Sequence, residues 1–230
     1  MIDLSKIKPN RKKAIFLAKK QISEFVCDAV NLEGINYTLP EVQTLLDGIT
    51  VGGHRVQDQT ITLNQARAWK YLFKSIEDNT FQISKHFMCE LHAIAANEEA
   101  LTWGCFRDGG VTIAGTAYQP PHHTSLSSTI NNMVGQYLDF SQDNIYPKAI
   151  SFFLDMARTQ FFYDVNKRMG RFMMNGILLK NGYPAINLPA KRQLEFNQLM
   201  LTFYGSGEKQ PMIDFMISCL DENTLKIMSE

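Results

Sequence analysis

The sequence has few cysteines and no spacing that would pair them. Its four cysteines, Cys27, Cys89, Cys105 and Cys219, are scattered, and none belongs to a Cys-x-x-Cys pair. Disulfide-stapled small domains and zinc sites depend on closely spaced cysteines. We therefore expect a protein of a reducing compartment, whose cysteines are small buried groups.

The sequence also lacks an excess of charge of either sign. Lysine plus arginine number 23 and aspartate plus glutamate number 23, so the net charge is +0. Binding to nucleic acid rests on many phosphate contacts made by a basic surface. The composition therefore predicts no nucleic-acid partner, while a local anion site remains compatible with it.

Long apolar runs are missing as well. No run approaches the roughly 18 apolar residues that suggest a membrane span, and the N-terminal stretch MIDLSKIKPNRKK has no signal-peptide core. We expect a soluble cytoplasmic protein with no membrane partner. Its 230 residues, 45% of them hydrophobic, are enough to build a sizeable core.

What the sequence does contain is helical periodicity along most of its length. Apolar residues that recur at three- and four-residue spacing predict amphipathic helices. The predicted helices cover roughly residues 11–31, 38–46, 61–76, 83–94, 126–137, 147–157, 166–180, 190–204 and 211–228. Gly34 is suited to ending the first helix in the left-handed conformation, and Thr38 with Glu41 three residues later predicts a capping box. The fold class predicted is all-α.

One segment breaks this periodicity. In CFRDGGVTIAGTAYQPP, an Asp-Gly-Gly turn signal stands between a short aromatic stretch and the β-branched Val111, Thr112 and Ile113. This pattern predicts a small β-hairpin, which must lie on the helical body because two short strands are not stable alone. Such a hairpin can pair its main chain with an extended peptide, although a plain connecting loop fits the sequence equally well.

Chemistry-bearing side chains concentrate between residues 158 and 171, in RTQFFYDVNKRMGR. An acid, an amide and three cations stand together there, namely Asp164, Asn166, Lys167, Arg168 and Arg171. If a helix begins near Asn166, its first amides and its dipole favour an anion such as a nucleotide phosphate. Arg168 and Arg171 are three residues apart, so both guanidinium groups can reach one polyphosphate.

The same stretch also predicts a place for a metal ion. Asp164 stands just before the predicted helix, and Mg²⁺ is commonly held by one or two carboxylates plus substrate phosphates. From spacing alone, a polar helix start with capping and salt bridges accounts for these residues as well. The histidines offer no second metal site: His86 and His92 are six residues apart and are expected to be ordinary core or surface side chains.

The segment QFFYDVNKRMGR resembles the Fic motif, His-Pro-Phe-x-Asp/Glu-Gly-Asn-Gly-Arg-x-x-Arg. The positions that match are Phe162, Asp164, Asn166, Arg168 and Arg171, and the Asn-Lys-Arg run is similar to that of the related Doc toxins. The stretch AVNLEGINYTLPEVQTLLDG resembles the inhibitory helix of Fic proteins, with Glu33-Gly34 as its glutamate-glycine pair. The resemblance covers roughly residues 29–183. It implies a Fic-type helical bundle with a hairpin flap, divided into an N-terminal region at 1–57 and a core domain at 58–230.

The resemblance also implies a function. Fic proteins are nucleotidyltransferases that move AMP from ATP, with Mg²⁺, onto a Ser, Thr or Tyr hydroxyl of a protein target, whereas Doc toxins move a phosphoryl group. Carried over residue by residue, Asp164 would bind Mg²⁺, and the nucleotide would be held by Asn166, Lys167, Arg168 and Arg171. Glu33 would inhibit by pairing with Arg171. The flap, Val111, Thr112, Ile113, Ala114 and Gly115, would align the target.

Three departures from the family pattern bear on activity. The motif histidine, which takes the proton of the target hydroxyl, is Gln160 here, and a positioned general base is worth roughly 10²- to 10⁴-fold in rate. Val165 and Lys167 replace glycines where backbone approaches phosphate. Ala29 replaces the serine or threonine that precedes the inhibitory glutamate. The sequence therefore leaves open a weak transferase, a Fic-fold module that only binds a nucleotide or protein, and a Doc-like phosphotransferase, and it does not decide whether the chain forms a homo-oligomer.

Overall fold

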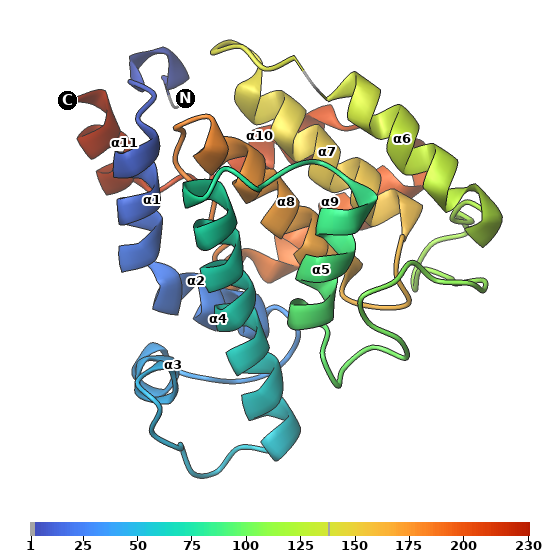
Figure 1. Cartoon of the computed structure of the whole chain (residues 1–230), viewed down its shortest axis with the longest axis horizontal. Helices are drawn as coiled ribbons and strands as arrows, with labels where there is room; N and C mark the ends of the chain where they lie inside the picture. Colours follow the sequence, from blue (N-terminus) through green and yellow to red (C-terminus); the bar gives the residue numbers. More distant parts are fainter. Residues whose placement is uncertain (1–2, 138) are drawn as a thin grey trace.

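The protein is built of helices (Figure 1). The computed structural model describes residues 3–137 and 139–230, and these residues form eleven α-helices and no strand. The α-helices are α1 Arg11–Lys20, α2 Ile22–Asn31, α3 Leu39–Leu46, α4 Val56–Glu77, α5 Lys85–Ala95, α6 Leu126–Gln136, α7 Ile145–Thr159, α8 Asn166–Lys180, α9 Gln193–Ser206, α10 Gln210–Ile217 and α11 Glu222–Ser229. The all-α prediction is confirmed. None of the helices in this part of the chain has both the length and the apolar character that crossing a bilayer requires.

Helices α7 and α8 form the centre of the molecule. They share the most extensive helix–helix contact of the described chain, with α4 and α5 packed on α8 and α10 packed on α7 (Figure 1). The two central helices approach closely because position 170 has no side chain: a Cβ there would lie 2.7 Å from Phe153 Cδ2 and 3.0 Å from the Phe153 carbonyl oxygen. This pair therefore carries the loop between Thr159 and Asn166 on a rigid support.

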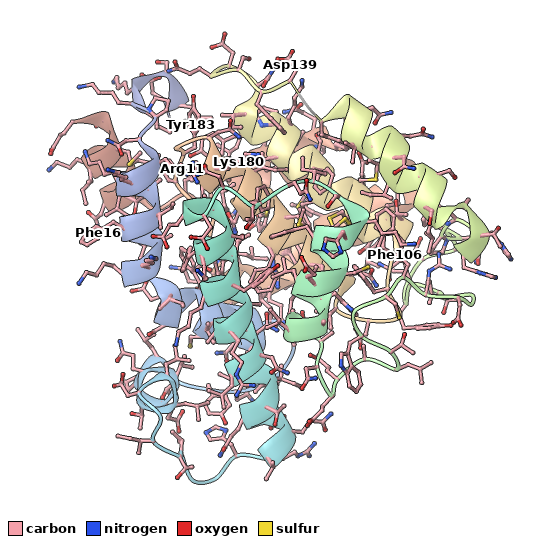
Figure 2. All side chains as sticks on the ribbon, in the orientation of Figure 1. Arg11, Phe16, Phe106, Asp139, Lys180 and Tyr183 are labelled. Atoms are coloured by element: carbon pink, nitrogen blue, oxygen red, sulfur yellow. The ribbon has the colours of Figure 1, made fainter. Side chains whose placement is uncertain are left out.

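The N-terminal helix predicted over residues 11–31 is two helices. The chain turns at Gln21, whose backbone is not helical (φ −96°, ψ 6°), and α1 ends there. The two halves have different partners: α1 packs on α8 and α11, whereas α2 packs on α3 and α4. Arg11, at the start of α1, lies beside the end of α8, near Lys180 and Tyr183 (Figure 2), and the Asn10 amide donates to the Gly182 carbonyl at 2.9 Å.

The C-terminal helix predicted over residues 211–228 is also divided. Asp221 lies between α10 and α11, and its carboxylate accepts a hydrogen bond from the Thr224 amide at 2.7 Å. A side-chain cap of this kind starts a new helix, and periodicity alone does not reveal it.

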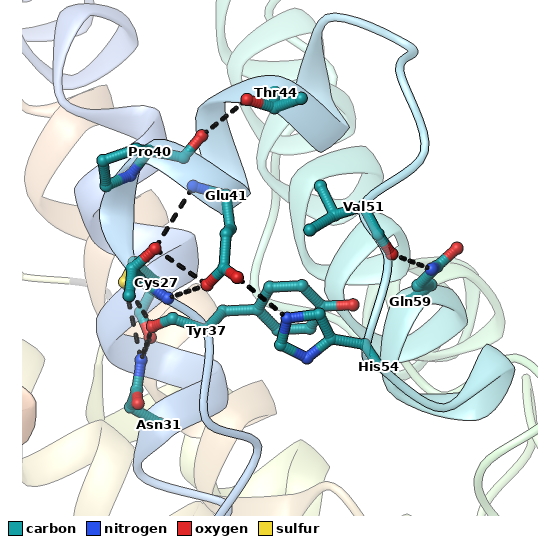
Figure 3. Close-up of polar contacts among 10 residues, drawn as sticks. Cys27, Asn31, Tyr37, Pro40, Glu41, Thr44, Val51, His54 and Gln59 are labelled. Carbon is teal, nitrogen blue, oxygen red and sulfur yellow. Dashed lines mark hydrogen bonds and ion pairs between the residues drawn. The ribbon is translucent and has the colours of Figure 1, made fainter.

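The connection from α2 to α4 is held by side chains (Figure 3). Gly34 has φ +80°, as predicted for the end of the helix before it, and the capping box is present, with the Thr38 amide donating to Glu41 Oε2 at 2.7 Å. Asn31 Nδ2 donates to the Tyr37 carbonyl at 2.8 Å. These contacts fix the turn that contains Glu33.

The predicted β-hairpin is not formed, and this part of the fold prediction is wrong. Residues 105–121 contain no strand, and their tight turn is at Ala114-Gly115 rather than at the Asp-Gly-Gly sequence. The cause is Arg107, whose backbone amide donates to the Phe161 carbonyl at 3.0 Å instead of pairing across a hairpin. Its buried guanidinium donates to three carbonyls, those of Gln160 (2.6 Å), Gly109 (2.7 Å) and Pro121 (2.5 Å). A loop fastened to the α7–α8 connection replaces the hairpin.

All four cysteines are free thiols, as expected, but their burial differs from the prediction. Cys219 is buried, Cys27 and Cys89 are half-buried, and Cys105 is exposed. The exposed thiol lies at the beginning of the loop that Arg107 fastens.

Candidate functional site

Helix α8 begins at Asn166, as the sequence predicts. The residue before it, Val165, adopts a left-handed backbone with φ 62° and ψ 11° and provides no side-chain cap. Within the described residues, no acceptor is recorded for the amides of Asn166, Lys167 and Arg168, since the first backbone bond at this end joins the Met169 amide to the Val165 carbonyl. These amides and the helix dipole favour an anion.

The loop between Thr159 and Asn166, called the motif loop below, has its two ends joined by the side chains of Gln160 and Asn166. Gln160 ends α7 in a left-handed conformation, its Nε2 donates to the Ala157 carbonyl at 2.6 Å, and its Oε1 accepts from Asn166 Nδ2 at 3.0 Å. Asn166 Oδ1 also accepts from the Phe162 amide at 3.0 Å, while Nδ2 donates to the Phe162 carbonyl at 2.8 Å. Both amide side chains are thus engaged within the loop.

Asp164 is the one exposed acid of the motif loop. Its Oδ1 accepts from the Val165 amide at 2.6 Å, and the residue as a whole is exposed. Within residues 3–137 and 139–230, no three His, Cys, Asp or Glu side chains gather in a way that would hold a metal ion. A single exposed carboxylate fits Mg²⁺ that arrives with substrate phosphates, because Mg²⁺ usually keeps several waters and takes one or two protein carboxylates.

His92 packs against the motif loop. The ring is fully buried, stacks on Phe162 with centroids 3.8 Å apart, and its Nε2 lies 3.4 Å from the Asp164 carbonyl oxygen. Its Nδ1 accepts from the Gly104 amide at 3.1 Å, which leaves Nε2 as the protonated nitrogen. Burial lowers the pKa of His92 to about 4, so the ring is neutral at physiological pH. The expectation of a core histidine is confirmed.

Arg168 lies between two carboxylates. Its guanidinium donates from Nη1 to Glu99 Oε2 at 2.9 Å and from Nη2 to Glu99 Oε1, and its Nε lies 3.5 Å from Glu33 Oε1. The side chain is only 3% exposed. Burial disfavours its charge, but the Glu99 hydrogen bonds and the charge of Glu33 raise the pKa of Arg168 above its ordinary value. Glu33, which the family resemblance pairs with Arg171, makes its recorded ion pair with Arg168 instead.

Arg171 is buried next to a small cavity. It is 9% exposed, and its Nη2 has no hydrogen-bond partner among the described residues. The cavity has a volume of about 30 Å³, and Arg168, Arg171, Gln65, Trp69 and Ala29 are among the residues that line it. Burial lowers the pKa of Arg171 to about 10, while the charge of Glu33 acts in the opposite direction. A space of this size holds water rather than a phosphate group.

Lys167 lies close to this cluster. The side chain is half-buried. Burial lowers the pKa of Lys167, and the charge of Glu33 opposes that shift. The structure thus brings Lys167, Arg168, Arg171 and Glu33 together, with Asp164 in the loop before the helix.

The segment expected to align a target, Val111 to Gly115, lies in the loop that Arg107 fastens. Val111 and Ile113 are half-buried, the other three residues are exposed, and across the described chain no hydrogen bond is recorded for the main chain of these five residues. Tyr163 connects the loop to the motif, because its hydroxyl donates to Asp108 Oδ1 at 2.6 Å. Phe106, labelled in Figure 2, packs on Phe161 with centroids 4.8 Å apart.

Three residues of this site could not be found by sequence reasoning. Glu99, Arg107 and His92 come from segments outside the motif, and Glu99 is 69 residues away from the arginine that it holds. The only sequence signal was the Glu98-Glu99 pair after a predicted helix, which by itself is typical of a solvated surface.

Comparison with known proteins relates the segment that contains this site to a protein family. Residues 82–178, which include α5, α6, α7, the motif loop and most of α8, match the Fic/DOC family. A Fic domain containing signaling protein from Bacteroides thetaiotaomicron has the same fold, with a TM-score of 0.78 at 17% identity over 98% of this chain and 91% of that one. Fic-1 from C. elegans aligns with a TM-score of 0.76 at 16% identity, over 95% of this chain and 70% of that one. The fold of the chain is therefore that of these Fic structures.

Sequence relatives of this chain carry Fic names as well. The "Protein adenylyltransferase Fic" of Drosophila mojavensis is 24% identical over an alignment of 216 residues, and the match covers 91% of this chain and 42% of that protein. The protein of the same name from Drosophila grimshawi is also 24% identical, and the match covers 44% of its length. The chain thus spans less than half the length of these relatives. Together these findings support a Fic-family protein, with residues 82–178 as the part that matches the family model.

Proposed function

We propose that the chain binds ATP at the start of α8 and transfers AMP slowly to a Ser, Thr or Tyr hydroxyl of a protein target. The observation that carries this proposal is that Arg168 and Arg171 line one cavity near the start of α8, with Lys167 next to them, within a Fic fold. Cationic donors close to unpaired helix amides suit a polyphosphate. The adenylyltransferase names of the relatives support ATP as the substrate.

The residues divide the binding task. Asp164 would hold Mg²⁺, which neutralises charge on the phosphates when bound. Arg171, whose Nη2 has no recorded partner, would take the terminal phosphate. Asn166 would contribute its backbone amide, because its side chain is already engaged with Phe162 and Gln160. Lys167 and Arg168 would add positive charge at the same helix start.

In the transfer step, the target hydroxyl oxygen bonds to the α-phosphorus of ATP, the bond from that phosphorus to the bridging oxygen breaks, and pyrophosphate leaves. The hydroxyl proton passes to water, because the Gln160 amide is not a base near neutral pH. We assign the slow rate to this missing base, which is worth roughly 10²- to 10⁴-fold. The main chain of residues 111–115, for which no hydrogen bond is recorded, would bind the main chain of the target.

Inhibition would come from the N-terminal region. We assign residues 1–57, of which residues 1–2 lie outside the described part, to an inhibitory unit and residues 58–230 to the core domain. Helix α2 ends beside α8, and Ala29 and Leu32 line the cavity next to Arg171. Because that cavity is about 30 Å³, ATP binding would require Glu33 and the end of α2 to move.

A second candidate function is nucleotide binding without transfer. Gln160 favours it, since both atoms of its amide are engaged by Ala157 and Asn166 and neither is free to orient a target hydroxyl. In this case the Fic fold would serve as a nucleotide-binding or protein-binding module. A third, Doc-like reaction would transfer the terminal phosphoryl group instead of AMP.

Position-specific labelling of ATP distinguishes the three. The protein, Glu33→Gly and Glu33→Gly/Gln160→His are incubated with Mg²⁺, a cell lysate and ATP labelled at either the α- or the terminal phosphate. AMP transfer predicts α-label on a protein, weak for the parent and strongest for the double variant, and none when Arg171→Ala is added. Terminal label would indicate the Doc-like reaction. If ATP binds but no protein is labelled, even after Gln160→His, the result would support nucleotide binding without transfer.

A further inference from the structure

Glu99 makes a bidentate contact with Arg168, and it belongs to neither the motif nor the inhibitory helix. It lies in the turn after α5, where the Glu99 amide donates to the Ala96 carbonyl at 3.1 Å. Helix α4 holds this turn, because Asn64 Nδ2 donates to the Asn97 carbonyl at 2.8 Å. Both Glu99 carboxylate oxygens accept from Arg168. A carboxylate is thus held at a fixed point facing the phosphate-binding end of α8.

The charges in direct contact with Arg168 oppose phosphate binding by that residue, although Lys167 and Arg171 add positive charge nearby. Arg168 contributes one positive charge, whereas Glu33 and Glu99 contribute two negative charges within ion-pair distance of it. The bidentate contact with Glu99 occupies Nη1 and Nη2, which are the atoms that would make a fork-like contact with a phosphate. Removal of Glu33 alone leaves this contact in place.

We propose that Glu99 is a second inhibitory carboxylate, which holds Arg168 away from nucleotide phosphates independently of Glu33. The inference rests on the proposed nucleotide site and adds to it a second contact that must break before Arg168 can bind substrate. A partner or target that moves the turn at residues 96–100 would release this contact. The exposed Leu101 and Trp103, which follow the turn directly, make that segment accessible.

An anion that is neither a substrate nor a nucleotide tests the contact first. Thermal unfolding is followed for the parent chain and for Glu99→Gln, with and without millimolar inorganic pyrophosphate. The substitution keeps the side-chain shape and removes the charge. Without pyrophosphate, Glu99→Gln is expected to unfold at a lower temperature, because buried Arg168 loses its counter-charge. With pyrophosphate, its unfolding temperature should rise well above any change seen for the parent.

Glu98→Gln is the matched control. The neighbouring Glu98 is exposed, and its substitution removes the same charge from the same turn. If pyrophosphate raises the unfolding temperature of Glu99→Gln no more than that of Glu98→Gln, the Glu99–Arg168 pair is only a structural ion pair and the proposal is wrong.

Calorimetry with ATP and Mg²⁺ then measures the independence of the two carboxylates. Each freed charge-assisted contact is expected to tighten binding by about tenfold. Glu33→Gly and Glu99→Gln should each tighten binding, and Glu33→Gly/Glu99→Gln should tighten it by about the product of the single effects, because each carboxylate holds Arg168 through its own contact. A double variant that binds no better than Glu33→Gly would overturn the proposal.

These readouts separate the inference from the proposed function. If no variant transfers AMP but pyrophosphate selectively stabilises Glu99→Gln, AMP transfer is wrong and the role of Glu99 stands. If Glu33→Gly transfers AMP and Glu99→Gln changes neither anion binding nor transfer, the proposed function stands and the role of Glu99 is wrong.

Discussion

Gln160 and Val165, at the two ends of the motif loop, have left-handed backbones with φ 53° and φ 62°. A β-branched residue is rare in this conformation, and such positions cost of order 1–3 kcal/mol. The loop keeps this shape because Asn166 makes three side-chain hydrogen bonds within it and the Val165 side chain is buried. Where the family motif has glycine, this chain has valine with a glycine-type backbone.

His92 gives the loop a pH dependence. Burial lowers its pKa to about 4 from the ordinary 6.5, so between these values the unfolded chain binds a proton that the folded chain does not. Its contribution to stability is therefore present above pH 6.5 and declines as the pH falls toward 4. At about 1.4 kcal/mol per pKa unit, the loss reaches at most about 3 kcal/mol.

Urea unfolding at pH 7 and pH 4.5 measures this contribution. His92→Gln should show a smaller drop in unfolding free energy between the two conditions than the parent. His86→Gln, which changes an exposed histidine paired with Glu90, should keep the parent's drop. Equal drops in all three proteins would rule out His92 as the source.

Among the elements, the α7–α8 pair determines where the loop lies. The two helices meet at Gly170, and the sequence already marks both helices through their apolar periodicity. The flap is the counter-example: β-branched residues after Asp-Gly-Gly predict a hairpin, but a buried arginine with carbonyl partners from other segments outweighs that local preference. Local propensity predicts an element well only when no distant group competes for its backbone.

Gly170→Ala should destabilise the fold by about 1–3 kcal/mol, because the added Cβ meets Phe153 side-chain and backbone atoms that are fixed in α7. Gly135→Ala is the control, since Gly135 lies in α6 with no atom within 4 Å of an added Cβ. There the change should stabilise by up to about 1 kcal/mol through higher helix propensity. Urea unfolding compares the two, and a similar effect at both positions would contradict the close helix contact.

Arg107→Ala should loosen the attachment of the loop at residues 105–121 to the connection between α7 and α8. The substitution leaves the carbonyls of Gln160, Gly109 and Pro121 without this donor, at about 1–3 kcal/mol for each that stays buried. Hydrogen exchange should quicken at the Arg107 amide, which bonds to Phe161, and unfolding should need less urea. Arg55→Ala, at an exposed arginine before α4, should change neither measurement. Unaltered exchange in Arg107→Ala would show that the loop is fastened by other contacts.

For the whole molecule, the sequence predicts the cations of the site, and the family resemblance adds Glu33, but neither predicts Glu99. Arg168 and Arg171 share one helix, so spacing alone places them together. Glu99 reaches Arg168 across 69 residues, and Glu33 reaches it from the end of α2. The breaks at Gln21 and Asp221 escaped prediction for a related reason, since each depends on packing partners or a cap that an apolar repeat does not encode.

The central claim is that the start of α8 is a nucleotide-phosphate site kept closed by carboxylates. Calorimetric titration of ATP with Mg²⁺ into the parent, Glu33→Gly/Glu99→Gln, and that double variant with Arg171→Ala tests it most directly. The claim predicts weak or undetectable binding to the parent, one-to-one binding to the double variant, and its loss when Arg171 is removed. A folded double variant that binds no ATP would contradict it.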